Sequence, residues 1–305
     1  MFIFKYRKIF FTISTLLVLG TIYGAYVYGF NFGVDFLGGT ITEVRYPNTL
    51  PAKDSVDEAV TALNLGGFSV RTSETDRYII RTKELSLEES ASLRNALDKL
   101  DGEVDNSIVI ERANTIGPVA GSELKDKAIK AILVVILMIV LFVTFVFRKV
   151  SKPVSSWKYG LSTIICLAHD VLIPTGIFIF LGAFYGLEID LLFVSGLLAI
   201  LGYSVHDTIV VFDRIRENLR INQEKRTNEE FESVVGKSVT QTMGRSINTS
   251  LTLLITLIAL FVIGSSATRD FALLLVIGVI AGTYSSVFIA SPLLVTFYKL
   301  QKKVK

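Results

Sequence analysis

Six blocks of apolar residues, separated by polar connections, form the most regular pattern along the chain. They cover about residues 9–29, 128–147, 158–182, 189–212, 246–264 and 271–297. A helix needs roughly 20 consecutive apolar residues to cross a hydrocarbon core of about 30 Å, and each block is close to or above that length. The pattern therefore predicts six membrane-spanning helices.

In the longest polar connection, residues 31–127, short segments with strand and helix patterns of apolar residues alternate, as in a compact α+β domain. Strands are predicted at 40–46, 68–72, 77–82 and 107–111, with the middle two in a hairpin. Two helices are predicted from the capping boxes Ser55-x-x-Glu58 and Ser86-x-x-Glu89, ending at Gly66-Gly67 and at Gly102. The order β-α-β-β-α-β is that of a ferredoxin-like sandwich, a scaffold that identifies no activity by itself.

The composition agrees with a membrane protein and argues against several other classes. Apolar residues make up 51% of the 305 residues, and the mean hydropathy of +0.54 is too high for an ordinary globular protein. The single cysteine, Cys166, cannot form an intramolecular disulfide, and the two histidines lie in apolar blocks without a cluster of metal ligands. The sequence contains no Walker loop, nucleophile elbow or dinucleotide fingerprint. We therefore expect neither an enzyme nor a bound cofactor or metal.

Lysine and arginine cluster in four segments that share one side of the membrane if the six helices alternate in direction. The segments are residues 1–8, 148–158, 214–245 and 299–305. Positive residues favour the cytoplasmic side, so both termini are predicted to be cytoplasmic and residues 31–127 periplasmic. The periplasmic segment has eleven Lys and Arg against seventeen Asp and Glu, a formal charge of −6. Insertion topology and anionic membrane lipids explain the basic loops, and nucleic acid is not expected as a partner.

Asp207 stands inside the fourth apolar block, where a charge is costly. A carboxylate at the centre of a spanning helix costs roughly 2.5–3.5 kcal/mol on insertion scales. Asp207 lies six residues, or about 9 Å along a helix, before the charged end at Asp213. An acid kept at such a depth is by default a functional candidate, and it points to ion or proton movement. The residues that share its helix face and suit close helix contact are Gly196, Ile200, and Tyr203 or Ser204.

The fifth block opens with a polar stripe on one helix face, formed by Arg245, Asn248, Thr249 and Thr252. Arg245 is expected at a depth comparable with that of Asp207. A guanidinium beside a carboxylate favours the ionised acid, whereas dry separation favours the neutral acid, so such a pair would suit a proton-carrying switch. The alternative is that Arg245 extends to the membrane surface while Asp207 sits in a static hydrogen-bonded pair.

Two further features lie in the third and sixth blocks. Asp170 falls near the midplane, where it either relays protons or fixes helix packing. Its neighbour His169 is expected to be structural, because adjacent helical residues diverge by about 100° and cannot both face one partner. In the sixth block, Gly278 and Gly282 form a Gly-x-x-x-Gly seam for close helix contact, followed by hydroxyls at 283–286.

Three segments carry a resemblance to a known family. They are NFGVDFLGGT at 31–40, GYSVHDTIVVFDRIREN at 202–218 and QTMGRSINTS at 241–250. On these motifs, and in length, span count and single outer domain, the chain resembles the SecF subunits of the SecD/SecF family, within the resistance-nodulation-division superfamily. The resemblance assigns the family's essential acid to Asp207 and its arginine to Arg245. His206 stands where the family usually has asparagine, which alters the hydrogen bonding beside the acid.

The resemblance also implies a function and a set of partners. It implies a subunit of the bacterial inner membrane that acts with SecD, YajC and the SecYEG channel on a translocating preprotein, using the proton-motive force late in export. Moving one charge through 100 mV is worth about 2.3 kcal/mol, and the links 30–39 and 115–127 would transmit the motion to the outer domain. Two alternatives stay open: a proton-coupled small-molecule efflux subunit of the same superfamily, and a scaffold that only binds partners.

Overall fold

The computed structural model describes residues 2–47, 49–73, 76–101, 108–148 and 154–304. Contacts between residues divide the chain into two compact units. The helical unit comprises Met1–Phe30, Lys130–Leu187 and Leu192–Lys305, and the α+β unit comprises Asn31–Ile129 and Glu188–Leu191. The short segment Glu188–Leu191 connects the third and fourth spans, yet it belongs to the α+β unit.

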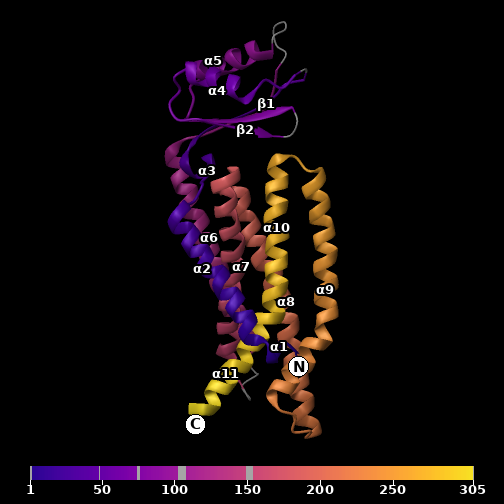
Figure 1. The fold of residues 1–305 in the computed structure, drawn as a ribbon. Coiled ribbons are helices and arrows are strands. Elements are labelled where there is room, and N and C mark those ends of the chain that lie inside the picture. Colours follow the sequence, from indigo (N-terminus) through magenta and orange to yellow (C-terminus); the bar gives the residue numbers. More distant parts are fainter. Residues whose placement is uncertain (1, 48, 74–75, 102–107, 149–153, 305) are drawn as a thin grey trace. The chain divides into compact units, whose positions relative to one another are not determined.

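Six helices in the described part of the chain are long and apolar enough to cross a membrane, as the apolar blocks predict. They are α2 (Arg7–Tyr28), α6 (Pro118–Val146), α7 (Ser156–Tyr185), α8 (Leu191–Lys225), α9 (Phe231–Ile263) and a last span, Thr268–Gln301. The last span is built from α10 (Ser266–Ser285), the five-residue π-helix η2 (Ser286–Ala290) and α11 (Ser291–Val304). A four-residue helix, α1 (Phe2–Lys5), precedes α2. Figure 1 shows α10 running between α7 and α9 and in contact with both.

Burial separates the spans into a core and a periphery. In the most apolar 18 residues of α7, α8 and the last span, 44%, 56% and 56% are buried, against 11%, 6% and 17% in α2, α6 and α9. Glycines permit the contact between α8 and the last span. A Cβ on Gly278 would overlap the side chain of Ile200, and a Cβ on Gly282 would lie 3.0 Å from Cβ of Ser204. Gly278 and Gly282 of the predicted Gly-x-x-x-Gly seam therefore lie against α8, where a side chain has no room.

The α+β unit contains a four-stranded antiparallel sheet within the described residues. Its strands are β1 (Gly39–Arg45), β2 (Ser69–Ser73), β3 (Arg77–Thr82) and β4 (Val109–Ile116), in the spatial order β2-β3-β1-β4. Helix α4 (Lys53–Ala62) follows β1, and α5 (Leu87–Asp98) with the 3-10 turn η1 (Lys99–Asp101) follows β3. This arrangement confirms the predicted ferredoxin-like fold and its hairpin.

Alternation along the central strands gives this sheet one apolar and one charged face. Val44 on β1 and Ile80 on β3 are fully buried and pack against Val56 from α4. Residues that alternate with these along the strands lie on the opposite face of the sheet and form ion pairs. One joins Arg45 and Glu111 at 2.9 Å. The core of the unit therefore lies between the sheet and its two helices.

The two predicted capping boxes have different outcomes. Ser86 caps α5 as expected: its hydroxyl accepts from the backbone N–H of Glu89 at 3.2 Å, and its own N–H donates to that side chain at 2.8 Å. The box at Ser55 is wrong, because the N-cap of α4 is Ala52, three residues earlier, and the helix has no side-chain cap. The helix ends before the predicted glycines, since the backbone already turns at Asn64 with φ of +52°.

Two expected boundaries at the end of the domain also differ. The last strand continues to residue 116 rather than ending at 111, and most of its side chains are exposed. The segment 115–127, expected as a link, is instead the end of β4, Gly117, and the first turns of α6. The predicted stop at Gly102 and strand start at Ser107 lie outside the described residues.

Two glycines at the start of β1, Gly38 just before the strand and Gly39 as its first residue, are required by both space and backbone. They follow a single helical turn, α3 (Val34–Leu37), and Gly38 and Gly39 have φ of +78° and +133°, a region that favours glycine. A Cβ on Gly38 would lie 2.6 Å from Cα of Pro118, and a Cβ on Gly39 would lie 2.5 Å from the carbonyl oxygen of Thr82. The pair therefore lets β1 approach both β3 and the first residue of α6.

The turn between α7 and α8 is hydrogen-bonded to the segment that leads into these glycines. The backbone carbonyl of Ile189 accepts from the N–H of Gly33 at 2.9 Å. The N–H of Ile189 donates to the backbone carbonyl of Asn31 at 2.8 Å. The carboxylate of Asp35 accepts from the N–H of Leu191, the first residue of α8, at 3.0 Å. Asp35 and Leu191 both belong to the α+β unit, so this bond holds the turn within that unit.

Glu188, in the same turn, is largely buried beside Arg81 of β3. Only 11% of its side chain is exposed, and it forms an ion pair with Arg81. Burial raises the pKa of Glu188 to about 7, an effect that Asp190 and Asp35 reinforce and Arg81 opposes. Glu188 therefore changes charge near neutral pH at the point where the sheet meets the turn before α8.

Candidate functional site

Two aspartates are buried in the helical unit, within the part of the chain that the structure describes. Asp170 on α7 is fully buried, and Asp207 on α8 is 7% exposed. Both lie in spans, where an unpaired carboxylate is costly. Each carboxylate therefore needs hydrogen-bond partners within the helical unit.

Asp207 is held by two serine hydroxyls from two other helices. Ser246 on α9 donates to Oδ1 and Ser286 in η2 donates to Oδ2, both at 2.5 Å. Both serines are buried. Among the described residues, no lysine or arginine lies within ion-pair distance of Asp207, so both of its oxygens are satisfied by neutral donors.

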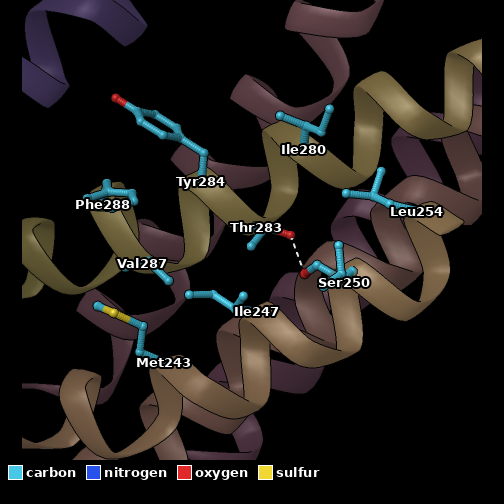
Figure 2. Close-up of a pocket in the computed structure, with 10 residues that line it drawn as sticks. Met243, Ile247, Ser250, Leu254, Ile280, Thr283, Tyr284, Val287 and Phe288 are labelled. Atoms are coloured by element: carbon cyan, nitrogen blue, oxygen red, sulfur yellow. Dashed lines mark hydrogen bonds between the residues drawn. The ribbon is translucent and has the colours of Figure 1, made fainter.

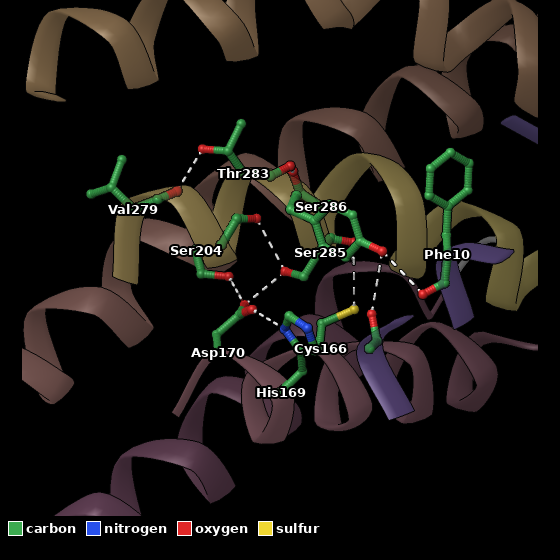
Figure 3. Close-up of polar contacts among 12 residues, drawn as sticks. Phe10, Cys166, His169, Asp170, Ser204, Val279, Thr283, Ser285 and Ser286 are labelled. Carbon is green, nitrogen blue, oxygen red and sulfur yellow. Dashed lines mark hydrogen bonds and ion pairs between the residues drawn. The ribbon is translucent and has the colours of Figure 1, made fainter. Parts of the chain in front are cut away.

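Asp170 is surrounded by three donors (Figure 3). Ser204 of α8 and Ser285 of α10 both donate to Oδ2, the latter at 2.8 Å. Nδ1 of His169 lies 2.9 Å from Oδ1, and the imidazole ring stacks on Tyr284 with the centroids 6.0 Å apart. His169 thus contacts its own neighbour, and it holds that carboxylate from the α7 side.

The two acids take one donor each from consecutive residues of the last span. Ser285 donates to Asp170 and Ser286 donates to Asp207, at the point where α10 ends and the π-helix η2 begins. Single π-helical turns inside α-helices are frequent at functional sites. The sequence predicted the hydroxyls at 283–286 only as groups for helix contact and missed their bonds to the acids.

A hydroxyl network continues from Ser246 to a cavity between α9 and the last span (Figure 2). Ser250 donates to the carbonyl of Ser246 at 2.8 Å, and its hydroxyl lies 2.6 Å from that of Thr283 and 2.7 Å from that of Tyr203. The cavity has a volume of about 330 Å³, and most of the side chains around it are apolar. This lining suits an apolar group and offers no charge to a polar solute.

The predicted approach of Arg245 to Asp207 is not formed. Arg245 is exposed on α9, and the two side chains make no ion pair in the part of the chain that is described. The rest of the stripe is also exposed: Thr249 bonds to the carbonyl of Arg245 and Thr252 to that of Asn248, both at 2.9 Å.

The physical reason is a rotation of about 100° between neighbouring helical positions. Ser246 occupies the inward position on α9, so Arg245 points away from the helical unit. The inward stripe consists of Thr242, Ser246 and Ser250, which are buried and spaced four residues apart. This regular spacing of small hydroxyl residues was the sequence signal that could have identified the partner of Asp207.

The other predicted residues also divide into buried ones at helix contacts and exposed ones. Ser204, Gly278 and Gly282 lie at the contact between α8 and the last span. His206 is exposed and lies on a different side of α8 from its neighbour Asp207. Within the described residues, no group of three or more His, Cys, Asp and Glu side chains could hold a metal ion.

Two family models match this chain. The C-terminal model of the SecD/SecF protein export membrane proteins matches residues 96–300, and the SecD/SecF GG motif matches residues 26–46. The chain belongs to the SecD/SecF family. The GG motif of the family covers Gly38 and Gly39, whose backbone and surroundings exclude a side chain.

Similar proteins extend over nearly the whole chain. The protein translocase subunit SecF of Thermobaculum terrenum is 38% identical over 97% of this chain and 93% of its own length. The SecF subunit of Sebaldella termitidis is 33% identical over 99% of this chain and 93% of its own length. The crystal structure of SecDF from Thermus thermophilus, described as a translocon-associated membrane protein, matches with a TM-score of 0.78 and 32% identity. That match covers 97% of this chain but only 38% of the SecDF chain.

Within this SecD/SecF family member, the buried acids offer proton-binding chemistry. A serine hydroxyl can donate to a carboxylate or accept from a carboxylic acid. The neutral donors around Asp207 therefore accommodate either charge state, whereas a fixed guanidinium would favour the ionised acid.

Proposed function

We propose that this chain is the SecF-like subunit of a Sec protein-export machinery and acts with SecD to use the proton-motive force in late preprotein translocation. Family membership and near full-length similarity to SecF subunits support the export role. One observation carries the proton role: Asp207 is buried in a span and held by the neutral donors Ser246 and Ser286.

The energy available to such a site is sufficient to move a domain. Each charge that crosses 100 mV contributes about 2.3 kcal/mol, so a few protons per event can shift a conformational equilibrium by several kcal/mol. Asp207 takes up and releases the proton, and Asp170 belongs to the same pathway because Ser285, its donor, is next to Ser286. The α+β unit is the proposed responding part, because it contains Glu188–Leu191, the chain segment that joins the third and fourth spans.

The exposed stripe on α9 supports a partner within the membrane. Arg245, Asn248 and Thr249 project from a span whose other exposed residues are largely apolar, for example Ile247 and Leu251. Lipid tails cannot satisfy a guanidinium or an amide, whereas polar groups on a neighbouring helix bundle can. SecD is the proposed neighbour, and Arg245 acts at that contact rather than beside Asp207.

Charge distribution supports the proposed orientation in the bacterial inner membrane. Positive residues favour the cytoplasmic side, so the basic connections support cytoplasmic termini and a periplasmic α+β unit. YajC, the SecYEG channel and the translocating preprotein are proposed as further partners through family membership alone.

Gradient-driven translocation tests the proposal. In inverted inner-membrane vesicles that depend on this chain, a preprotein is started with ATP and then released by an imposed gradient alone. We expect Asp207→Asn to reduce completed translocation to the level without a gradient. Asp213→Asn serves as the matched control, because Asp213 lies on the same helix with 53% of its side chain exposed.

Membrane level and co-purification with SecD are measured for both variants, so that loss of insertion is separated from loss of activity. Retained gradient-dependent translocation in stably inserted Asp207→Asn would contradict the proton role. Failure of the natural chain to co-purify with SecD, together with altered drug sensitivity on its removal, would instead favour efflux.

A further inference from the structure

The two buried acids are joined through the backbone of the last span. We propose that Ser285 and Ser286 couple the protonation of Asp170 to that of Asp207, and that the π-helical turn they open is the element that responds. The inference rests on the proposed function in one respect only, namely that Asp207 changes its protonation state.

Each of the two serines has one hydroxyl hydrogen but two acceptors within reach. The hydroxyl of Ser285 lies 2.8 Å from Asp170 and 3.1 Å from the carbonyl of Gly282. The hydroxyl of Ser286 lies 2.5 Å from Asp207 and 3.0 Å from the carbonyl of Thr283. A hydroxyl can donate its hydrogen along only one of these directions at a time.

The charge state of each acid selects between the two directions. An ionised carboxylate only accepts, so the serine hydrogen points at the acid. A protonated carboxyl can donate to the serine oxygen instead, which frees the serine hydrogen for the carbonyl three residues earlier in its own helix. Proton uptake thus exchanges a bond between helices for a bond within the last span.

The exchange at one serine affects the other because the acids and serines form a closed ring. Ser285 and Ser286 are consecutive, and both are fully buried. On the other side, Ser204 donates to Asp170 and lies three residues before Asp207 on α8. A shift of the last span that relaxes one acid therefore changes the distance from Ser285 or Ser286 to the other acid.

The surroundings contain few other groups that could perform this coupling. His169 contacts Asp170 from its own helix, and Ser246 contacts Asp207 from α9. The thiol of Cys166 lies 3.9 Å from the carbonyl of Ser285. No lysine or arginine among the described residues pairs with either acid, so the connection runs through one serine hydrogen bond to each acid and the peptide backbone between the two serines.

The test measures whether one acid affects the titration of the other. The full chain is labelled with ¹³C at the aspartate side-chain carboxyl, reconstituted in lipid nanodiscs, and followed by NMR against pH. The resonances of Asp207 and Asp170 are assigned from Asp207→Asn and Asp170→Asn. We expect Asp170→Asn to move the titration midpoint of Asp207 by about half a pH unit or more, the size typical of residues in one hydrogen-bond network.

The same shift is then measured in serine variants. We expect the shift to be lost in the double variant Ser285→Ala/Ser286→Ala and retained in Ser285→Thr/Ser286→Thr, which keeps both hydroxyls. Ser291→Ala is the matched control, because Ser291 is fully buried in the same span and bonds to neither acid. This control should leave the shift unchanged.

Three outcomes would overturn the coupling. The titration midpoint of Asp207 could stay unchanged on Asp170→Asn, the shift could persist in the double alanine variant, or the double threonine variant could lose the shift as well. If the double alanine variant does not fold, Ser285→Ala and Ser286→Ala are measured singly; each removes one of the two hydroxyls and should reduce the shift, and an unchanged shift in both would overturn the coupling. A coupled titration combined with export that is indifferent to Asp207→Asn would refute the proposed function and leave the coupling intact.

Discussion

The burial of Glu188 predicts that the α+β unit loses stability as the pH rises. The pKa of Glu188 is raised from its ordinary value of 4.5 to about 7, first because of burial. The folded chain therefore keeps this proton to higher pH than the unfolded chain. The stability it contributes is fully present below pH 4.5 and is lost as the pH rises through about 7. At 1.36 kcal/mol per pKa unit, the loss amounts to about 3 kcal/mol.

Replacement of Glu188 by glutamine removes this dependence. Glutamine has nearly the shape of the protonated acid and cannot ionise, so Glu188→Gln should hold the low-pH stability across the range. The assay is amide hydrogen exchange of the β1–β3 strand pair in the full chain, corrected for intrinsic rates and expressed as an opening free energy between pH 5 and pH 8. Glu58→Gln is the control, because Glu58 is exposed on α4.

We expect the natural chain and the Glu58 variant to lose opening free energy over this interval, and the Glu188 variant to lose much less. An equal loss in the Glu188 variant would show that another group is responsible. A natural chain with constant protection would refute the reasoning from burial altogether.

Three further perturbations follow from the packing and the exposed surface. Gly278→Ala should destabilise the helical unit by about 1–3 kcal/mol, because the added methyl group overlaps Ile200. The double variant with Ile200→Ala should lose less stability than the sum of the two single changes. Gly244→Ala is the control and should leave the stability unchanged, because a Cβ at Gly244 has no atom within 4 Å. Ser86→Ala should reduce the exchange protection of α5 by about 1 kcal/mol, because it removes the cap. Arg245→Leu should weaken co-purification with SecD while leaving thermal unfolding of the isolated chain unchanged, since Arg245 is exposed.

Much of the fold follows from signals that do not depend on distant residues. Apolar blocks of about twenty residues predict the six spans without any knowledge of packing. In the α+β unit, alternation and turn residues were sufficient for the hairpin and for the order of elements. The end of β4 was missed because its side chains are mostly exposed and show no alternation.

The partners of Asp207 could not be predicted in the same way, because they depend on helix rotation. On α9, Arg245 and Ser246 are adjacent, and a difference of one position decides which side chain faces the core. Arginine was the stronger electrostatic signal, whereas the buried hydroxyls repeat every fourth residue and each could equally bond to its own helix. The environment of Glu188 was likewise hidden, because Arg81 lies more than a hundred residues away in sequence.

Proton movement through Asp207 is the central claim and can be measured directly. The chain is reconstituted with its SecD partner into liposomes that contain a pH-sensitive dye, and a membrane potential is imposed. We expect the natural pair and Asp213→Asn to acidify or alkalise the interior at equal rates, and Asp207→Asn to match liposomes without protein. Proton flux in Asp207→Asn at the natural rate would contradict the account.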